Sequence, residues 1–260
     1  MAKYSELKDK VVLITGGTQG IGEAMADAFS AEESRVIING RVLNEKVRKV
    51  LDRTGADCSM GGISDTEVAE KVVKHVEEKY GKIDVLICNA AGMSMSPFLE
   101  RKEEEWWNQI NINLTGHVAC IQAALQGMKK NGGGTIIIIS SFFGTIGWNN
   151  ATGYGSSKSG LLALGQYISR QYKDFNIKAC VIVPGVINTP QLNVDANDLG
   201  ITREEVCEMY AKDIAMLRIA QPSEIAEAAT FMATKDGGRG LNGRHIIVSG
   251  GEYRSTPYYL

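Results

Sequence analysis

The sequence predicts an α/β fold with one doubly wound, Rossmann-like parallel sheet of about seven strands and helices on both faces. Short β-branched runs alternate along the chain with longer segments of helical periodicity, which is the pattern of strand–helix–strand units. The strand candidates are continuously apolar, as in a sheet that helices cover on both sides. Right-handed crossovers would wind such a sheet twice, and its ligands would bind beyond the carboxyl ends of the strands.

The expected elements alternate in order. Runs rich in Val and Ile predict strands at residues 11–15, 35–39, 57–60, 83–88, 135–140, 178–184 and 245–249. Helical spacing, shown by the valines at 68, 72, 73 and 76, predicts helices at 21–31, 43–53, 65–80, within 102–129, and at 153–172 and 222–233. Pro222 suits the first turn of the last helix. Residues 185–218 form a long polar segment, which we expect to be a substrate-binding lid within one domain spanning 1–260.

Composition narrows the class of protein. The net charge is −2 and no block of Lys and Arg marks one face, which argues against a nucleic-acid partner. The longest aliphatic run, Ile136–Ile139, is too short to cross a bilayer, so we expect no membrane span. The five cysteines are scattered, and with a polar start of the chain they suggest a cytoplasmic protein without a cysteine-based metal site.

A glycine-rich turn follows the first predicted strand. The run Thr15–Gly22 places Gly16, Gly20 and Gly22 in a GxxxGxG spacing that opens a predicted helix. Such glycines let the backbone turn tightly and approach a pyrophosphate, which the helix N-terminus would attract. An ordinary glycine turn is the alternative, but the strand before it and the helix after it favour dinucleotide binding.

Tyr154 and Lys158 lie four residues apart at the start of a predicted helix, so their side chains share one face. A free tyrosine has a pKa of about 10 and is a poor acid or base at neutral pH. A neighbouring ammonium favours the phenolate and lowers that pKa, which makes the pair a candidate proton donor and acceptor. On spacing alone, a solvated helix face is the commoner explanation.

Several motifs in one order support the catalytic interpretation. The chain carries Thr15–Gly22, Asn89–Gly92, Asn113 in an Asn-Leu-x-Gly run, Ser141, the Tyr154/Lys158 pair and Pro184–Gly185. In this order and spacing the sequence resembles the short-chain dehydrogenase/reductase family, in its form of about this length, over nearly the whole chain. The resemblance implies an enzyme that transfers a hydride between a nicotinamide cofactor and a secondary alcohol or ketone.

The resemblance assigns four catalytic residues. Tyr154 would be the acid/base, and Lys158 would lower the tyrosine pKa and hydrogen-bond the nicotinamide ribose. Ser141 would hold the substrate oxygen, and Asn113 would support a water that leads protons to Lys158. Their neighbours Ser140 and Asn111 are rivals. The position of Ser141 thirteen residues before Tyr154 and the Asn-Leu-x-Gly context of Asn113 favour the first choices. No metal is required.

The resemblance also assigns a cofactor-binding set. Backbone of Val186 or Ile187 would meet the carboxamide, and Thr189 would reach the carboxamide or the phosphates. The complete set is Gly16, Thr18, Gln19, Gly20, Ile21, Arg41, Asn89, Ala90, Gly92, Tyr154, Lys158, Pro184, Gly185, Val186, Ile187 and Thr189.

The end of the second predicted strand favours NADP(H) over NAD(H). An acidic residue that would bind the ribose hydroxyls is expected there, but the chain reads Ile38-Asn39-Gly40-Arg41. The Arg41 guanidinium is well shaped for a 2′-phosphate. NAD(H) stays open, because Gln19 stands where NADP-preferring relatives often carry a second basic residue.

The substrate is less defined. Candidate lining residues form an apolar and aromatic set with a few polar groups: Ser94, Met95, Phe142, Phe143, Trp148, Asn149, Ile187 and Leu192. A hydroxysteroid, a 3-oxoacyl compound, a polyol or a cyclic ketone would suit it. The alternatives are an NAD-dependent dehydrogenase and a non-catalytic dinucleotide sensor, against which the four catalytic residues argue.

We expect a homodimer or homotetramer, since the family usually pairs through two long helices, here about 102–129 and 153–174. The tail 253–260 carries three tyrosines. We expect it either to dock near the pocket of a neighbouring subunit or to cover its own.

Overall fold

A computed structural model describes residues 2–252; the predicted docking of the tail, 253–260, lies outside the described residues. Seven parallel strands form one sheet in the order β3-β2-β1-β4-β5-β6-β7. The strands are β1 (Val11–Ile14), β2 (Arg35–Ile38), β3 (Asp57–Cys58), β4 (Val85–Cys88), β5 (Gly134–Ile139), β6 (Ile177–Pro184) and β7 (His245–Val248). The predicted fold class is therefore confirmed.

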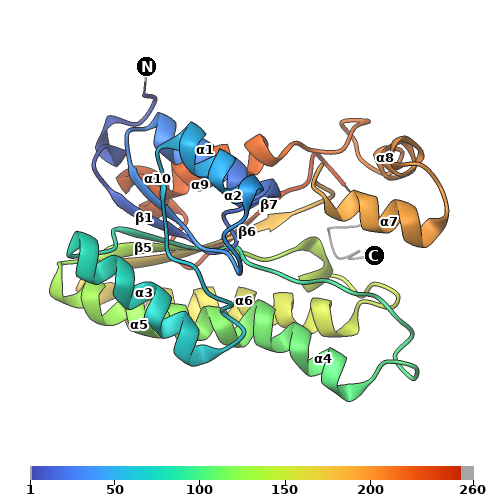
Figure 1. Cartoon of the computed structure of the whole chain (residues 1–260), viewed down its shortest axis with the longest axis horizontal. Helices are drawn as coiled ribbons and strands as arrows, with labels where there is room; N and C mark the ends of the chain where they lie inside the picture. The colour runs from blue at the N-terminus through green and yellow to red at the C-terminus, as the bar shows by residue number, and fades with distance from the viewer. Residues whose placement is uncertain (1, 253–260) are drawn as a thin grey trace.

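Helices cover both faces of the sheet (Figure 1). One face carries α1 (Gly20–Ala31), α2 (Glu45–Thr54), α9 (Pro222–Ala233) and α10 (Lys235–Gly240). The other carries α3 (Thr66–Tyr80), α4 (Glu103–Ile110), α5 (Gly116–Lys130) and α6 (Thr152–Gln171). The order of strands reverses between β1 and β4, which makes a crevice at their carboxyl ends.

The core consists of two apolar layers, one on each side of the sheet. Successive strand residues point to opposite faces, so Val12 and Ile14 pack beneath α1 and α9 while Val11 and Leu13 face α3 and α5. Both layers are fully buried. Strands that are apolar on both sides hold their carboxyl ends in fixed positions, and the loops that follow those ends inherit that placement.

The predicted long helix within 102–129 is interrupted. Between α4 and α5 lies a π-helical segment, η2 (Asn111–Thr115), in which the Gly116 N–H bonds the Asn111 carbonyl. This i→i+5 bond widens one turn and inserts one residue, as in the π-bulges that often occur at functional sites.

The segment 185–218 contains two helices that the sequence did not reveal, α7 (Gln191–Leu199) and α8 (Arg203–Ala211). A capping box at Thr202 begins α8. Leu192, Val206 and Ile214 belong to a small apolar cluster of their own, separate from the two layers beside the sheet. The pair of helices therefore stands beyond the carboxyl edge of the sheet, supported by its own core (Figure 1).

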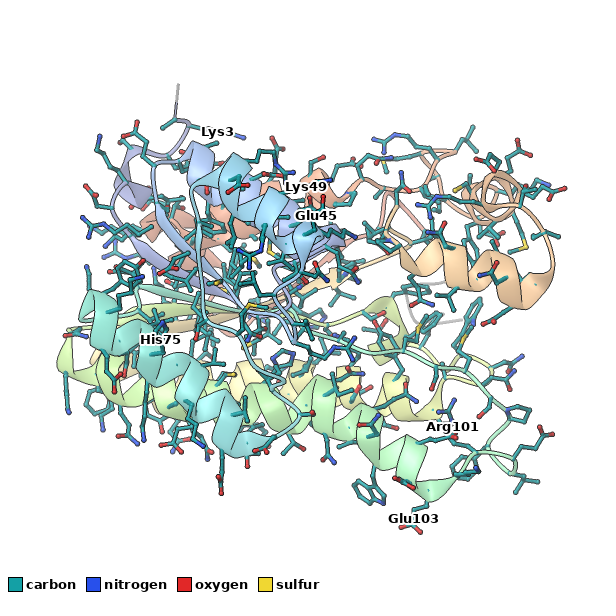
Figure 2. The ribbon with its side chains drawn as sticks, viewed as in Figure 1. Lys3, Glu45, Lys49, His75, Arg101 and Glu103 are labelled. Atoms are coloured by element: carbon teal, nitrogen blue, oxygen red, sulfur yellow. The ribbon has the colours of Figure 1, made fainter. Side chains whose placement is uncertain are left out.

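Charged side chains cover the outer helix faces, as Figure 2 shows for Glu45 and Lys49 on α2, which form an ion pair of 3.4 Å. His75 on α3 is also exposed. No helix in residues 2–252 has the length and apolar character that crossing a membrane needs.

Candidate active site

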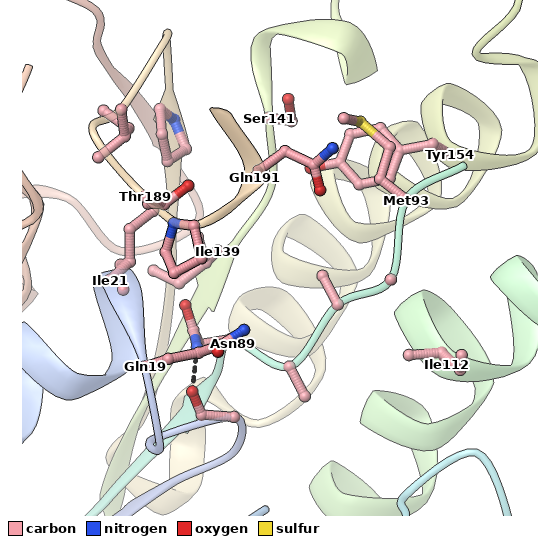
Figure 3. A pocket seen from close by; sticks show the side chains of 18 of the residues that line it. Gln19, Ile21, Asn89, Met93, Ile112, Ile139, Ser141, Tyr154, Thr189 and Gln191 are labelled. Carbon is pink, nitrogen blue, oxygen red and sulfur yellow. Dashed lines mark hydrogen bonds between the residues drawn. The ribbon is translucent and has the colours of Figure 1, made fainter. Parts of the chain in front are cut away.

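A cavity of about 870 Å³ opens at the carboxyl edge of the sheet, between the glycine-rich loop, the strand ends and α7. Every residue of the predicted cofactor-binding set lines it. Figure 3 shows Gln19, Ile21 and Asn89 toward one end, and Ser141 and Tyr154 toward the other. The structure thus brings together residues that are up to 173 positions apart, Gly16 and Thr189 among them.

The glycine-rich loop packs so closely against neighbouring backbone that two of its positions have no space for a Cβ atom. Gly16 adopts a φ of 66°, and a Cβ there would lie 2.7 Å from the Ala90 Cα. A Cβ on Gly22 would lie 2.1 Å from the Gly16 carbonyl oxygen. Asn89 fixes the loop, since its side-chain Nδ2 donates to the carbonyls of Thr15 and Gly16 at 3.1 and 3.0 Å. This cradle ends at the N-terminus of α1 and fits a pyrophosphate.

Tyr154, Ser141 and Lys158 meet at the other end of the cavity. Ser141 is the second residue after the end of β5, and its hydroxyl hydrogen-bonds the Tyr154 phenol. The Lys158 Nζ lies 5.6 Å from the centroid of the Tyr154 ring and donates to the Ile139 carbonyl at 2.9 Å. Lys158 is 1 % exposed, so its ammonium is held where little water screens it.

The pKa values of this pair differ from the sequence expectation. Burial raises the pKa of Tyr154, and its hydrogen bond to Ser141 only opposes that rise. Burial also lowers the pKa of Lys158 to about 8. In the ligand-free protein the pKa of Tyr154 is therefore raised on balance and not lowered as the spacing predicted, because the spacing of four reveals proximity but not the loss of hydration.

Asn113 does not line the cavity but lies fully buried behind it, in the π-helical segment. Its Oδ1 accepts from the Gly92 N–H at 2.8 Å, and its Nδ2 donates to the Gly92 carbonyl at 2.9 Å and to the Ser157 Oγ at 3.2 Å. The side chain thereby ties the loop after β4 to α6. The rival, Asn111, is exposed.

Ser140, the rival of Ser141, also lines the cavity, but its hydroxyl donates to the Lys158 carbonyl at 2.7 Å. It therefore joins the end of β5 to the backbone of α6. Ser141 instead caps the short 3-10 turn that follows, accepting from the Phe143 N–H at 3.2 Å, and contacts Tyr154. The two serines therefore have different environments.

Two cations lie near the glycine-rich loop, and one of them, Arg41, lines the far end of the cavity. Arg41 is exposed and lines the cavity just after β2. The Lys46 Nζ, in the first turn of α2, lies 3.5 Å from the Gln19 Oε1. Sequence reasoning missed Lys46, because its approach to Gln19 joins a helix to a loop 27 residues earlier.

The wall around Tyr154 is aromatic on one side. Phe143 and Trp148 stack with centroids 5.1 Å apart, and Phe143 meets the Tyr154 ring edge-on at 6.1 Å. Six predicted substrate-lining residues do line the cavity: Met95, Phe142, Phe143, Trp148, Ile187 and Leu192.

Two predicted substrate-lining residues do not line the cavity. The Ser94 hydroxyl accepts from Arg101 and Gln109 at 3.1 and 3.3 Å, which holds it among α4 and its preceding loop. Asn149 is exposed in a turn where Asn150 has a φ of 63°. In their place α7 and α8 contribute Gln191, Asp195 and Tyr210, polar residues that the sequence analysis missed.

Among the residues that the structure describes, no group of three or more His, Cys, Asp and Glu side chains is arranged to hold a metal ion.

Known proteins are similar to this chain in sequence and in fold. The chain is 33 % identical over 254 residues to an L-rhamnose-1-dehydrogenase of Scheffersomyces stipitis, covering 94 % of this chain and 96 % of that protein. It is 32 % identical over 241 residues to the 3-oxoacyl-[acyl-carrier-protein] reductase MabA of Mycobacterium tuberculosis, covering 92 % and 91 %. The structure of L-sorbose reductase from Gluconobacter frateurii with NADPH and L-sorbose superposes with a TM-score of 0.88 at 25 % identity, covering 94 % and 97 %.

A doubly wound sheet with a glycine-rich loop after its first strand is typical of dinucleotide-binding proteins. The model of the short chain dehydrogenase family matches residues 10–199. The chain therefore belongs to the short-chain dehydrogenase/reductase family, as the order of its motifs indicated. It is an oxidoreductase of the kind that uses a nicotinamide cofactor.

The buried ammonium of Lys158 predicts a stability that rises in alkaline solution. Lysine titrates near 10.4 in an unfolded chain, but here its pKa is lowered to about 8. Below pH 8 the cost of burying the charge is fully present. Between these two values the unfolded chain binds more protons than the folded one, so the free energy of unfolding rises with pH, by about 2–3 kcal/mol from this group.

The measurement is denaturant unfolding of the cofactor-free protein between pH 7.5 and about 10.5. The Lys158→Gln variant is the control, since it keeps every other titrating group. Subtracting its profile from the wild-type profile isolates Lys158, and parallel profiles would contradict the lowered pKa.

Proposed function

We propose that this protein transfers a hydride between NADP(H) and a secondary alcohol or ketone, with Tyr154 as the acid/base. The observation that carries the proposal is the meeting of Tyr154, Ser141 and Lys158 at one end of a cavity whose other end is a glycine cradle. A dinucleotide laid from the cradle along the strand ends would bring its nicotinamide to that group.

The bound nicotinamide supplies or accepts the hydride. In the direction of reduction, negative charge develops on the substrate oxygen as the carbonyl carbon is reduced. Ser141 donates a hydrogen bond to that oxygen, and the Tyr154 hydroxyl gives it a proton, which yields the alcohol and a phenolate. In oxidation the phenolate takes the proton from the alcohol. Both donors are already in contact in the structure, so little reorganisation is needed.

Lys158 stabilises the phenolate by its charge. The buried ammonium has its pKa lowered to about 8, and so carries a proton at neutral pH. Its Nζ donates to Ile139 and lies on the Tyr154 side of α6, where a cofactor ribose would approach it. Asn113 acts as a positioning residue, because its bonds to Gly92 and Ser157 fix the loop and the helix that frame the site.

NADP(H) is the favoured cofactor because of the charge near the glycine cradle. Arg41 follows β2 where a ribose-binding carboxylate would stand in an NAD-specific site. Lys46 adds a second cation beside Gln19. A 2′-phosphate near Arg41 would then have an ammonium as well as a guanidinium close by. Together they supply the point charge and the planar fork that suit a phosphate.

The 185–218 segment is proposed as the substrate-binding lid. Its helices α7 and α8 supply lining residues to the cavity and pack on their own apolar cluster. Relatives act on L-rhamnose, on L-sorbose and on 3-oxoacyl chains carried by a protein. Those three compounds, with simple cyclic ketones and alcohols, make the panel for assay with NADPH, NADH, NADP⁺ and NAD⁺ by absorbance of the reduced nicotinamide.

Tyr154→Phe removes the proton donor and keeps the ring, so turnover on the panel should fall by about 100-fold or more. The Kd for NADPH should change little, because the phenol is at the substrate end of the cavity. Tyr172→Phe at the end of the same helix is the matched control and should behave as wild type. A Tyr154→Phe enzyme as fast as wild type would overturn the catalytic assignment.

Arg41→Ala and Lys46→Ala should each weaken NADPH by roughly tenfold, since a charge-assisted hydrogen bond contributes about 1.5–3 kcal/mol. NADH should bind each variant as it binds wild type. Lys49→Ala on the outer face of α2 is the control, and calorimetry gives the Kd values. At least tenfold tighter binding of NADH than NADPH by the wild type would reverse the preference in favour of an NAD-dependent dehydrogenase.

We also propose a homodimer or homotetramer that pairs through the long helices. Trp107 on α4 and Tyr167 on α6 are 50 % and 72 % exposed. Two large aromatic side chains exposed on neighbouring helices are typical of a surface that a second subunit covers. Tyr167→Arg should lower the mass measured by light scattering. His75→Arg introduces the same side chain on α3, away from this helix pair, and should leave the mass unchanged. A monomeric wild type would disprove the proposal.

A further inference from the structure

The cavity has polar lining residues as well as aromatic ones near its substrate end. This polar wall consists of three residues from the lid helices: Gln191 and Asp195 lie one turn apart on α7, and Tyr210 lies in the last turn of α8. Figure 3 shows the Gln191 side chain directed toward the end of the cavity that holds Ser141 and Tyr154.

Asp195 is the centre of this wall. Its Oδ1 accepts from the Gln191 Nε2 at 3.0 Å, and its Oδ2 accepts from the Tyr210 hydroxyl at 3.3 Å. The residue is only 7 % exposed and lines the cavity. An ionised carboxylate has about four acceptor positions, so each oxygen retains capacity for a donor from a ligand.

The charges along the cavity limit what that ligand can be. Among the described lining residues the cations are Arg41, at the far end, and Lys158, buried behind Tyr154. A substrate carrying a phosphate or a carboxylate would therefore bring its negative charge toward Asp195, and no cation among the described residues of the lid lines the cavity to balance that charge. A like charge placed in such a site disfavours binding.

The stacked rings of Phe143 and Trp148 line the same cavity as Asp195 and give it an apolar surface. A sugar or polyol ring offers C–H groups on one side and hydroxyl donors at its rim, which match an aromatic wall and a carboxylate acceptor. We infer that the substrate is a neutral polyhydroxylated carbonyl compound or alcohol, a sugar or polyol, whose hydroxyl groups remote from the reacting carbon donate to Asp195 and bond to Gln191.

The inference rests on the proposed function and names the substrate class of that same site. Remote hydroxyl contacts orient the reacting carbon between Ser141 and Tyr154, so their binding energy is expressed in kcat/KM. A ring without hydroxyl groups gains nothing from Asp195. The wild type should therefore prefer L-sorbose or L-rhamnose to cyclohexanone or cyclohexanol, and to a hexose phosphate, by at least roughly tenfold in kcat/KM.

The decisive variant is Asp195→Asn, which keeps the shape and a hydrogen-bonding carbonyl but removes the charge. It should lower kcat/KM for the preferred sugar by about 10- to 100-fold, as for the loss of a charge-assisted hydrogen bond. Its kcat/KM for cyclohexanone or cyclohexanol and its Kd for NADPH should stay at the wild-type values. Asp198→Asn, an exposed change one turn along α7, is the matched control and should alter neither substrate class.

Gln191→Met tests the same wall without changing a charge, and should also affect the sugar selectively. Equal losses for the sugar and for the hydroxyl-free ring would show that Asp195 only holds α7 to α8, and would overturn the inference. A wild type that prefers the hydroxyl-free ring, the hexose phosphate or the 3-oxoacyl thioester would overturn it as well, while leaving hydride transfer intact. No turnover of any panel compound with either cofactor would instead overturn the proposed function itself.

Discussion

Two hydrogen bonds between β5 and α6 set the geometry on which the site depends. The Lys158 Nζ donates to the Ile139 carbonyl, and the Ser140 hydroxyl donates to the Lys158 carbonyl. Together they fix both the height and the rotation of α6 against the end of the strand. Tyr154 lies one turn before Lys158 on that helix, so the two hydrogen bonds that hold Lys158 also direct the Tyr154 side chain toward Ser141. The position of the Tyr154 side chain is thus defined by the end of β5 and by α6.

The same arrangement buries the ammonium of Lys158 away from water. Burial of Lys158 costs stability, as the lowering of its pKa to about 8 indicates, and gives the charge a stronger effect on a nearby phenolate than it would have in water. His117, also buried, has its pKa lowered to about 3 by burial and by the charge of Lys158. It is therefore neutral when it bonds to the Ala90 carbonyl, and adds no second charge.

Local patterns in the sequence predicted the parts of the fold and the site that local rules determine. The strand runs, the glycine-rich turn and the order of motifs led to the sheet and to the residues that meet at its edge. Burial is not local, so the spacing of Tyr154 and Lys158 gave their proximity and the wrong direction for the tyrosine pKa. The contacts of Lys46 with Gln19 and of Asp195 with Tyr210 join separate elements, and no period in the sequence signals them. The sequence analysis did not predict α7 and α8, because their many polar residues made the segment 185–218 resemble an irregular loop.

The π-helical turn between α4 and α5 lets these two helices, which follow each other directly along the chain, present different faces to the rest of the fold. Each residue of an α-helix turns the next by about 100°, so the additional residue at 111–115 lets α4 face α6 while α5 keeps Cys120 and Ile121 in the core. Asn113 occupies that wide turn. The length of this stretch is consequently as constrained as its composition: substitutions at its exposed positions are absorbed locally, whereas an insertion or deletion would rotate a whole helix relative to the sheet and separate Asn113 from Gly92.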